Sequence, residues 1–140
     1  TSVAILQSMD WAAGKPSEEV AALLQTLTQP GEIFGSPLYM SPEQCNGQEA
    51  DCRSEVYSLG CMVFEILTGA APLRGRDAME TMLKKVRDKP PLMGSIAKDT
   101  KFSDELEAVV QHCLERDPDK RYQSVAELGQ AWKQFESSKN

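Results

Sequence analysis

The stretch that decides the fold reads "RSEVYSLGCMVFEILTG" and covers residues 53–69. Ser54 is a favourable N-cap residue and Gly69 a favourable C-terminal stop, so the pattern predicts a helix that runs to about Thr68. Its apolar residues cover one face (Val56, Leu59, Val63, Ile66 and Leu67) and much of the remaining surface (Cys61, Met62 and Phe64). A helix that is apolar nearly all round belongs in a protein interior. We therefore expect this helix to be the buried centre of the fold.

Three further helices are predicted downstream of this centre. The first starts at Asp77 and reaches about Asp88, where "KPP" stops it; the second follows Ser103 and is broken by "RDPDKR"; the third follows Ser124. A glutamate three positions after Asp77 and another three positions after Ser124 match the capping-box pattern. The predicted core-facing residues are Leu106, Val109, Val110, Cys113 and Leu114 in the second helix and Val125, Leu128, Trp132 and Phe135 in the third. The downstream half therefore has the pattern of a mainly α protein.

Upstream of the central helix, the sequence predicts little regular structure. "VAIL" at residues 3–6 is a candidate short strand, and residues 17–25 have a short helical pattern. Residues 26–52 are rich in prolines and turn residues, with at most one turn of helix after Pro42. An irregular stretch of this length in a compact domain is usually functional or disordered.

Length and charge exclude several classes of protein. A chain of 140 residues, with 41% hydrophobic and 26% charged residues, suffices for one packed domain or a piece of one. The net charge is −6, and residues 1–70 contain only Lys15 and Arg53 as bases. A nucleic-acid binder gathers basic residues on one face, so we expect no nucleic-acid partner.

The cysteines and the terminal sequence bear on the compartment. The four cysteines show no CxxC spacing and the single histidine, His112, has no second ligand pair nearby, so we expect no zinc site. Reduced thiols in a cytoplasm-like compartment are the simpler interpretation. No signal-peptide pattern is visible, and the longest apolar run is too short for a membrane span and contains Glu65. We therefore expect a cytoplasmic location and no membrane contact by this segment.

No motif completes an active site unaided, because GxSxG, HExxH and GxxxxGK[ST] are all missing from the sequence. Four strings in a fixed order nevertheless resemble the C-terminal lobe of serine/threonine protein kinases, and most closely the eukaryotic-like kinases of bacteria. These strings are "GSPLYMSPE" (35–43), "RSEVYSLGCMVFEILTG" (53–69), "APL" (71–73) and "ERDPDKRYQS" (115–124).

The resemblance implies a mainly α fold, namely the helical C-terminal lobe of the protein kinase-like fold, with the N-terminal lobe absent. Residues 35–137 would form the helical subdomain and residues 138–140 a tail. Residues 1–34 would contain the end of a DFG-like strand and the activation loop. The match extends from Glu32 to about Phe135 and is looser before Glu32.

The resemblance also assigns roles to three charged residues. Glu43 closes "SPE", where the family has APE, and matches with Arg121 the buried ion pair that ties the activation segment to the helical lobe. Glu55 matches an aspartate that anchors the catalytic loop. Glutamate keeps the acceptor oxygens but is one methylene longer, so we expect that loop to be held less firmly.

The loop before Glu43 resembles the substrate-facing loop of the family. Ser36 falls at the position that faces the residue to be phosphorylated, where serine/threonine kinases have Ser or Thr. With Ser36, the residues Pro37, Leu38 and Tyr39 would shape the pocket beside the acceptor hydroxyl. Taken alone, Ser36 would be an ordinary turn serine.

Further upstream the resemblance is looser. "DWAAGK" (10–15) aligns with the family's DFG motif, which would make Asp10 the Mg²⁺ ligand, with Trp11 for Phe and Ala12 for Gly. An ordinary turn after a strand is the alternative. Thr26 and Thr28 lie where such kinases are commonly phosphorylated, and the alternative is a polar loop with unmodified threonines.

The implied parent reaction is the Mg²⁺-dependent transfer of the ATP γ-phosphoryl group to a Ser or Thr hydroxyl of a protein. The Gly-rich loop, the VAIK-type lysine and the HRD loop are missing from this sequence. We therefore expect the chain alone to contain no catalytic residue, to be inactive and to bind neither ATP nor Mg²⁺ usefully. Its expected partner is a protein substrate or the missing N-terminal half of the kinase. The alternatives are a non-catalytic binding module, which would dock a protein partner through the helix at 77–88 and the loop before it, and a degenerate fragment.

Overall fold

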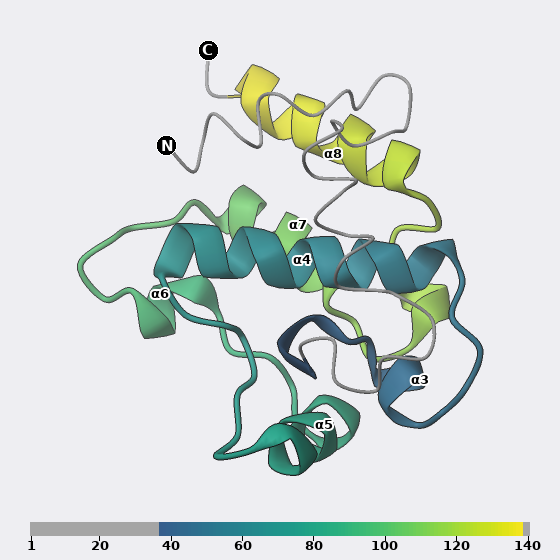
Figure 1. Ribbon diagram of the computed structural model, residues 1–140. Helices are drawn as coiled ribbons and strands as arrows, with labels where there is room; N and C mark the ends of the chain where they lie inside the picture. The colour runs from purple at the N-terminus through teal and green to yellow at the C-terminus, as the bar shows by residue number, and fades with distance from the viewer. Residues whose placement is uncertain (1–36, 139–140) are drawn as a thin grey trace.

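The centre of the molecule is α4, Cys52–Thr68, around which the other helices pack in the computed structural model (Figure 1). The structure describes residues 37–138. The remaining elements are η1 Pro37–Tyr39, α3 Pro42–Cys45, α5 Ala78–Arg87, α6 Met93–Ile96, α7 Asp104–Cys113, η2 Pro118–Lys120 and α8 Val125–Ser138. No strand occurs in this range, so the mainly α fold is confirmed. The predicted strand at 3–6 and helix at 17–25 lie outside the described residues.

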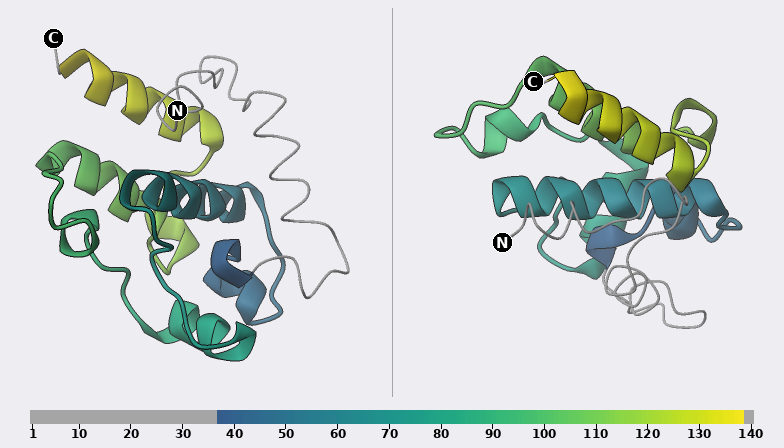
Figure 2. Two further views of the ribbon diagram at one scale, coloured as in Figure 1. Left: turned by 60° about the vertical axis from the view of Figure 1, so that its left-hand side comes forward. Right: turned by 90° about the horizontal axis from the view of Figure 1, so that it is seen from above.

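Burial of α4 follows from its sequence. The side chains of Val56, Cys61 and Phe64 are completely inaccessible to solvent, although they point in different directions around the helix. α7 and α8 pack on one side of α4, and η1 packs on another (Figure 2). η1 also contacts α5, which in turn contacts α3. The first turn is partly exposed at Cys52, Arg53 and Glu55, and the last turn, with Ile66 and Leu67, is half-buried. The prediction of a buried central helix is therefore confirmed.

The start of α4 differs from the prediction. The N-cap is Asp51 rather than Ser54, and its carboxylate accepts a hydrogen bond of 2.8 Å from the backbone N–H of Arg53. Ser54 is the third residue of the helix and is buried. Its hydroxyl accepts a hydrogen bond from the Asp51 N–H and donates one to the Glu43 carboxylate. Both residues are good caps, so propensity alone does not choose between them. Gly69 does end the helix, with a φ of 83° that suits glycine.

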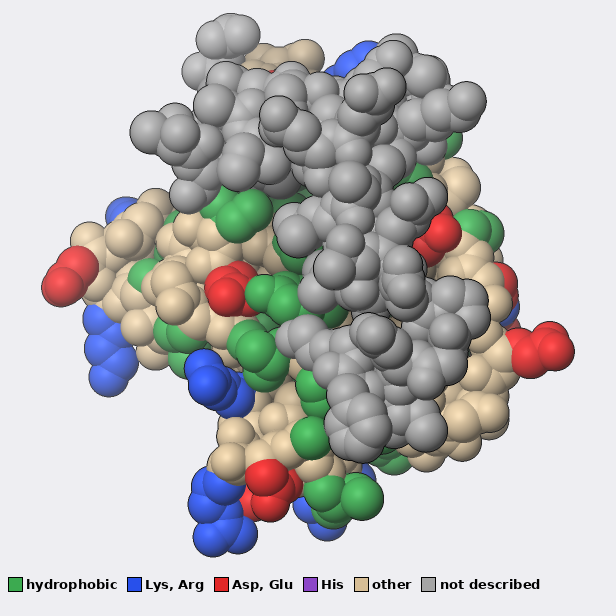
Figure 3. Space-filling view, in the orientation of Figure 1, with side chains coloured by type: hydrophobic (Ala, Val, Ile, Leu, Met, Phe, Trp, Pro, Cys, Tyr) green, Lys and Arg blue, Asp and Glu red, His purple; other side chains and the backbone are tan. Residues whose placement is uncertain are grey.

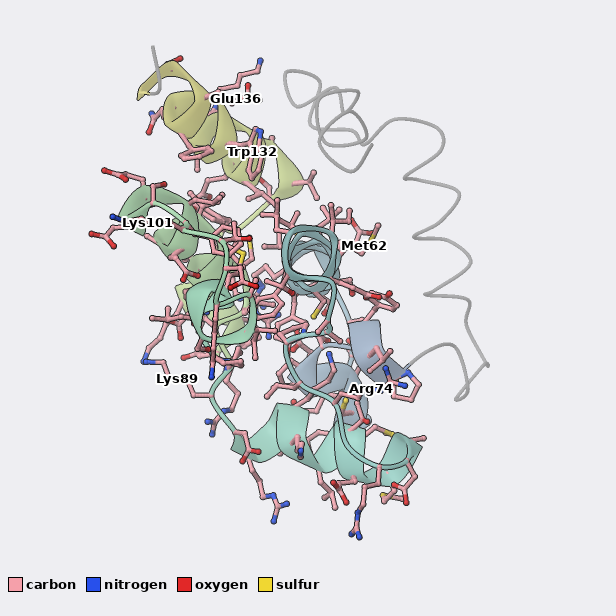
Figure 4. The ribbon with its side chains drawn as sticks, turned by 90° about the vertical axis from the view of Figure 1, so that its left-hand side faces the viewer. Met62, Arg74, Lys89, Lys101, Trp132 and Glu136 are labelled. Atoms are coloured by element: carbon pink, nitrogen blue, oxygen red, sulfur yellow. The ribbon has the colours of Figure 1, made fainter. Side chains whose placement is uncertain are left out.

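The downstream helices also follow the predicted pattern. All nine predicted core-facing residues of α7 and α8 are buried. Each capping box is only half-formed. The cap side chains of Asp77 and Ser124 accept from the backbone N–H of Glu80 and Glu127, as expected. The two glutamate carboxylates, however, accept from the backbone N–H of the residue before each cap, Arg76 and Gln123. Trp132 and Glu136, labelled in Figure 4, are joined by an indole N–H bond of 3.1 Å along α8.

α4 and α7 approach closely at Gly60. A Cβ atom at this position would lie 2.6 Å from the Cβ of Cys113, so only glycine allows the contact.

All four cysteines are free thiols, in agreement with the sequence. Between residues 37 and 138, no helix combines the length and the apolar character that crossing a bilayer requires.

Candidate functional site

The clearest polar feature of the interior is an ion pair between Glu43 in α3 and Arg121 just after η2. Two parallel bonds of 2.7 Å join the guanidinium nitrogens Nη1 and Nη2 to the carboxylate oxygens Oε2 and Oε1. Glu43 is 7% exposed and Arg121 is 2% exposed. Such bidentate pairs combine strength with strict geometry. The pair therefore fixes α3 against the far end of the chain.

Arg121 uses every donor that it has. Besides the two bonds to Glu43, it donates to the backbone carbonyls of Arg53, Glu115 and Arg116, so all five N–H groups are occupied. A buried guanidinium needs such complete pairing, because each unpaired donor would cost free energy. Arg121 thereby joins α3, the first turn of α4 and the segment just after α7.

Glu43 is held in its charged form. Burial opposes its ionisation, but hydrogen bonds from Arg121, from its own backbone N–H and from the Ser54 hydroxyl outweigh burial, so the pKa of Glu43 lies below its ordinary value. The segment around it is rigid as well, because the Ser41 hydroxyl caps α3 and the Gln44 side chain bonds back to Ser41. The short helix α3 is therefore capped at its N-terminus by a capping box.

Two side chains anchor η1, immediately before α3. The Lys85 ammonium of α5 donates 2.6 Å to the carbonyl oxygen of Leu38, and the Ser58 hydroxyl of α4 donates 2.6 Å to that of Tyr39. The Tyr39 hydroxyl donates to Glu65, and burial, together with this carboxylate, raises the pKa of Tyr39 to about 12. Segment 37–43 is thus fastened to α4 and α5 at several points.

Lys85 is an unusual anchor, because it is 1% exposed. Its ammonium also lies 3.6 Å from the Cys61 sulfur and 4.9 Å from the centre of the Tyr57 ring. Among residues 37–138 it makes no ion pair. Its partners are therefore neutral, and its positive charge is not cancelled by a neighbouring carboxylate.

A groove opens where η1 meets the loop before α5. This hollow of about 260 Å³ is lined by Pro37, Leu38, Arg74, Gly75, Arg76, Asp77, Ala78 and Thr81. Arg74 lies between the segment that contains η1 and α3 and the helix α5 (Figure 4). The groove thus combines two residues of the predicted substrate-facing loop with a basic wall that the motifs did not indicate.

The other predicted site residues have separate positions. Glu55 is exposed in the first turn of α4, and its carboxylate makes no hydrogen bond or ion pair with the described residues. Ser36, Thr26, Thr28 and Asp10 lie outside the described residues. Between residues 37 and 138 no group of three or more His, Cys, Asp or Glu side chains is placed to hold a metal ion.

Sequence reasoning missed three residues that position segment 37–43, namely Lys85, Ser58 and Glu65. Ser58 and Glu65 interrupt the apolar pattern of α4, and a polar residue in a buried helix must find a partner. That interruption was the available signal for both. For Lys85 the sequence gives no comparable signal, because lysines are ordinarily exposed on helices.

Comparisons with known proteins match most of this chain. Residues 19–133 match the family model described as protein kinase domain. The serine/threonine-protein kinase PknB of Mycolicibacterium smegmatis is 40% identical over 103 residues, which are 74% of this chain and 16% of that protein. A probable serine/threonine-protein kinase of Streptomyces coelicolor is 37% identical over 103 residues, 74% of this chain and 15% of the relative. One from Clostridium acetobutylicum is 31% identical over 124 residues, 89% of this chain and 18% of the relative. The chain thus spans less than a fifth of these relatives.

Removing Arg121 should destabilise the fold strongly. Arg121→Ala leaves the Glu43 charge buried without a partner, which typically costs about 3–5 kcal/mol. We expect this loss in urea unfolding, together with faster proteolysis near Glu43. Arg53→Ala is the control, since it breaks only exposed ion pairs with Asp51 and Asp119 and should cost much less. An unchanged melting temperature and unchanged proteolysis in Arg121→Ala would contradict the role of the pair.

Glu43 should also make stability depend on pH in the acid range. Because its pKa is lowered by folding, its contribution is complete above the ordinary glutamate pKa of about 4.3 and is lost as the pH falls through the lower folded value. We expect the unfolding free energy of the natural chain to fall more steeply below about pH 4 than that of Glu43→Gln, which cannot titrate. Parallel curves for the two proteins would show that Glu43 is not held in its charged form.

Proposed function

The chain belongs to the protein kinase family, and we propose that it supplies the substrate-facing loop and the helical platform of a serine/threonine kinase domain. The observation that carries this proposal is the anchoring of segment 37–43. Arg121, Ser58 and Lys85 fasten its buried side, while Pro37 and Leu38 line an open groove. A segment whose buried side is held by hydrogen bonds and whose other side lines an open groove is suited to positioning a polypeptide.

In the proposed function, this chain's residues contribute position rather than chemistry. Protein kinases transfer the γ-phosphoryl group of ATP with Mg²⁺, and most of the rate comes from positioning and charge stabilisation. Ser36 would face the acceptor hydroxyl, and Pro37, Leu38 and Tyr39 would shape the wall beside it. No step through Mg²⁺ is assigned to residues 37–138.

The same proposal covers the residues outside the described range and the partners. Residues 1–34 would hold the DFG-like aspartate Asp10, as a Mg²⁺ ligand, and the activation loop with its phosphosites Thr26 and Thr28. Residues 35–137 would form the helical subdomain, in which Glu55 anchors the catalytic loop. The partners would be a protein substrate and the rest of a kinase domain, and the chain by itself would transfer no phosphate.

A second candidate function is that of a non-catalytic binding module. It is favoured by α5, on which Met79 is 65% exposed and Leu83, four residues later, is 44% exposed. Residues at this spacing share one helix face. Over the lower part of Figure 3, where α5 lies, hydrophobic side chains share the surface with Lys and Arg side chains. A protein partner could bury this apolar pair without any phosphoryl transfer.

A chimera tests the kinase proposal. Residues 19–133 would replace the matching segment of the M. smegmatis PknB kinase, and the product would be assayed for transfer of labelled phosphate from ATP to casein. We expect phosphoserine and phosphothreonine to form. Glu55→Asp in the chimera should raise the turnover number, because the shorter side chain would hold the catalytic loop in the family's manner.

Two results would contradict the proposal. A chimera that folds and binds ATP but transfers no phosphate would favour the binding module. For the 140-residue chain alone, we expect no change in melting temperature on titration with Mg-ATP. A saturable rise would show that the chain binds nucleotide without the rest of the domain.

A further inference from the structure

We infer that the groove between η1 and the loop before α5 selects acceptor segments that carry an Asp or Glu side chain close to the phosphorylated residue. This inference rests on the proposed function, because it names the class of substrate that the same platform would hold. The selecting residues are Arg74 and Arg76, which the kinase-like motifs do not include.

The loop that carries the two arginines is rigid. The Gly75 N–H donates 2.9 Å to the Thr81 hydroxyl, which in turn donates 2.9 Å to the carbonyl of Asp77. A Cβ atom at Gly75 would lie 2.6 Å from the Cβ of Glu80, so the loop packs directly on the first turn of α5. The Lys84 ammonium donates 3.0 Å to the Arg74 carbonyl. The backbone between the arginines is therefore fixed before a ligand arrives, which lowers the entropy cost of binding.

Asp77, which lines the groove, and Glu80, which lies beside it, already have hydrogen-bond partners. Asp77 caps α5 and accepts from the Glu80 N–H at 2.8 Å, where the positive end of the helix compensates its charge. Glu80 accepts from the Arg76 side chain at 2.9 Å and lies 3.9 Å from Lys84. These two acids lie beside three cations, Arg74, Arg76 and Lys84, so the positive charges outnumber the negative ones whichever pairs form.

The cations of the groove are in excess. Arg74 is exposed, and its guanidinium makes no bond to any of the residues 37–138. The Arg76 side chain is 91% exposed, so its bond to Glu80 is a weak surface pair from which it can turn towards a ligand. Beneath the groove floor, the buried Lys85 ammonium holds the Leu38 carbonyl and has no carboxylate partner in the described range.

This balance favours one kind of side chain. A carboxylate entering the groove gains charge-assisted hydrogen bonds from Arg74 and Arg76, whereas a lysine or arginine meets like charges. The local excess of positive charge is notable in a chain whose net charge is −6. Exposed pairs of this kind are modest, so we expect a preference of about 3- to 10-fold in affinity.

The test uses the 140-residue chain and three fluorescein-labelled peptides. Each contains one serine among alanines, and the residues on both sides of the serine are glutamate, glutamine or lysine. Fluorescence anisotropy at low ionic strength should rank them glutamate, glutamine, lysine, with the glutamate peptide about 3- to 10-fold tighter than the glutamine peptide. The preference should disappear in the double variant Arg74→Gln, Arg76→Gln.

Arg87→Gln is the matched control, because Arg87 is an exposed arginine at the other end of α5 that does not line the groove. It should keep the preference. Equal binding of the three peptides, or a preference that survives in the double variant, would overturn the inference but would not contradict the proposed function. Failure of all three peptides to bind the natural chain would contradict the proposed function and the inference together.

Discussion

The buried pair between Glu43 and Arg121 is the constraint on which the rest of the structure depends. Its two parallel bonds join residues 78 positions apart in the chain. The remaining donors of Arg121 bind backbone carbonyls at the start of α4 and just after α7, so one side chain gathers three separate segments. Burying both charges is costly unless every donor is satisfied, and the geometry meets that condition. The pair thus specifies one arrangement of α3 on the helical body.

A second constraint acts through Tyr57. Its buried ring lies 5.0 Å from the Arg121 guanidinium carbon and 4.9 Å from the Lys85 ammonium. Arg121 holds Glu43 and Lys85 holds Leu38, so the two cations that fasten segment 37–43 contact one aromatic ring of α4. Such contacts stabilise desolvated cations. Segment 37–43 is therefore coupled to the core of the molecule, and the floor of the groove beside η1 is held by hydrogen bonds.

The sequence predicted the parts of the fold that depend on periodicity. Core residues such as Val110 and Leu128 were identified because apolar spacing reports burial directly. The N-cap of α4 was misplaced, since Asp51 and Ser54 are both good caps and the choice depends on the tertiary partner of Ser54. Burial of Lys85 was not predictable, because it depends on carbonyl and sulfur partners brought together only by the fold. The basic wall of the groove was missed for a similar reason, as the folded loop, rather than a motif, places Arg74 beside η1.

Hydrogen exchange of the backbone amides tests most directly whether segment 37–43 and α3 are part of the rigid body. The amides of Cys45 and Asn46 bond to the carbonyls of Ser41 and Pro42 at 3.0 Å. If the Glu43–Arg121 pair fastens α3 as described, these amides should open with the same free energy as the central amides of α4, in one cooperative unit. Exchange at the rate of an exposed loop, while α4 stays protected, would contradict the account.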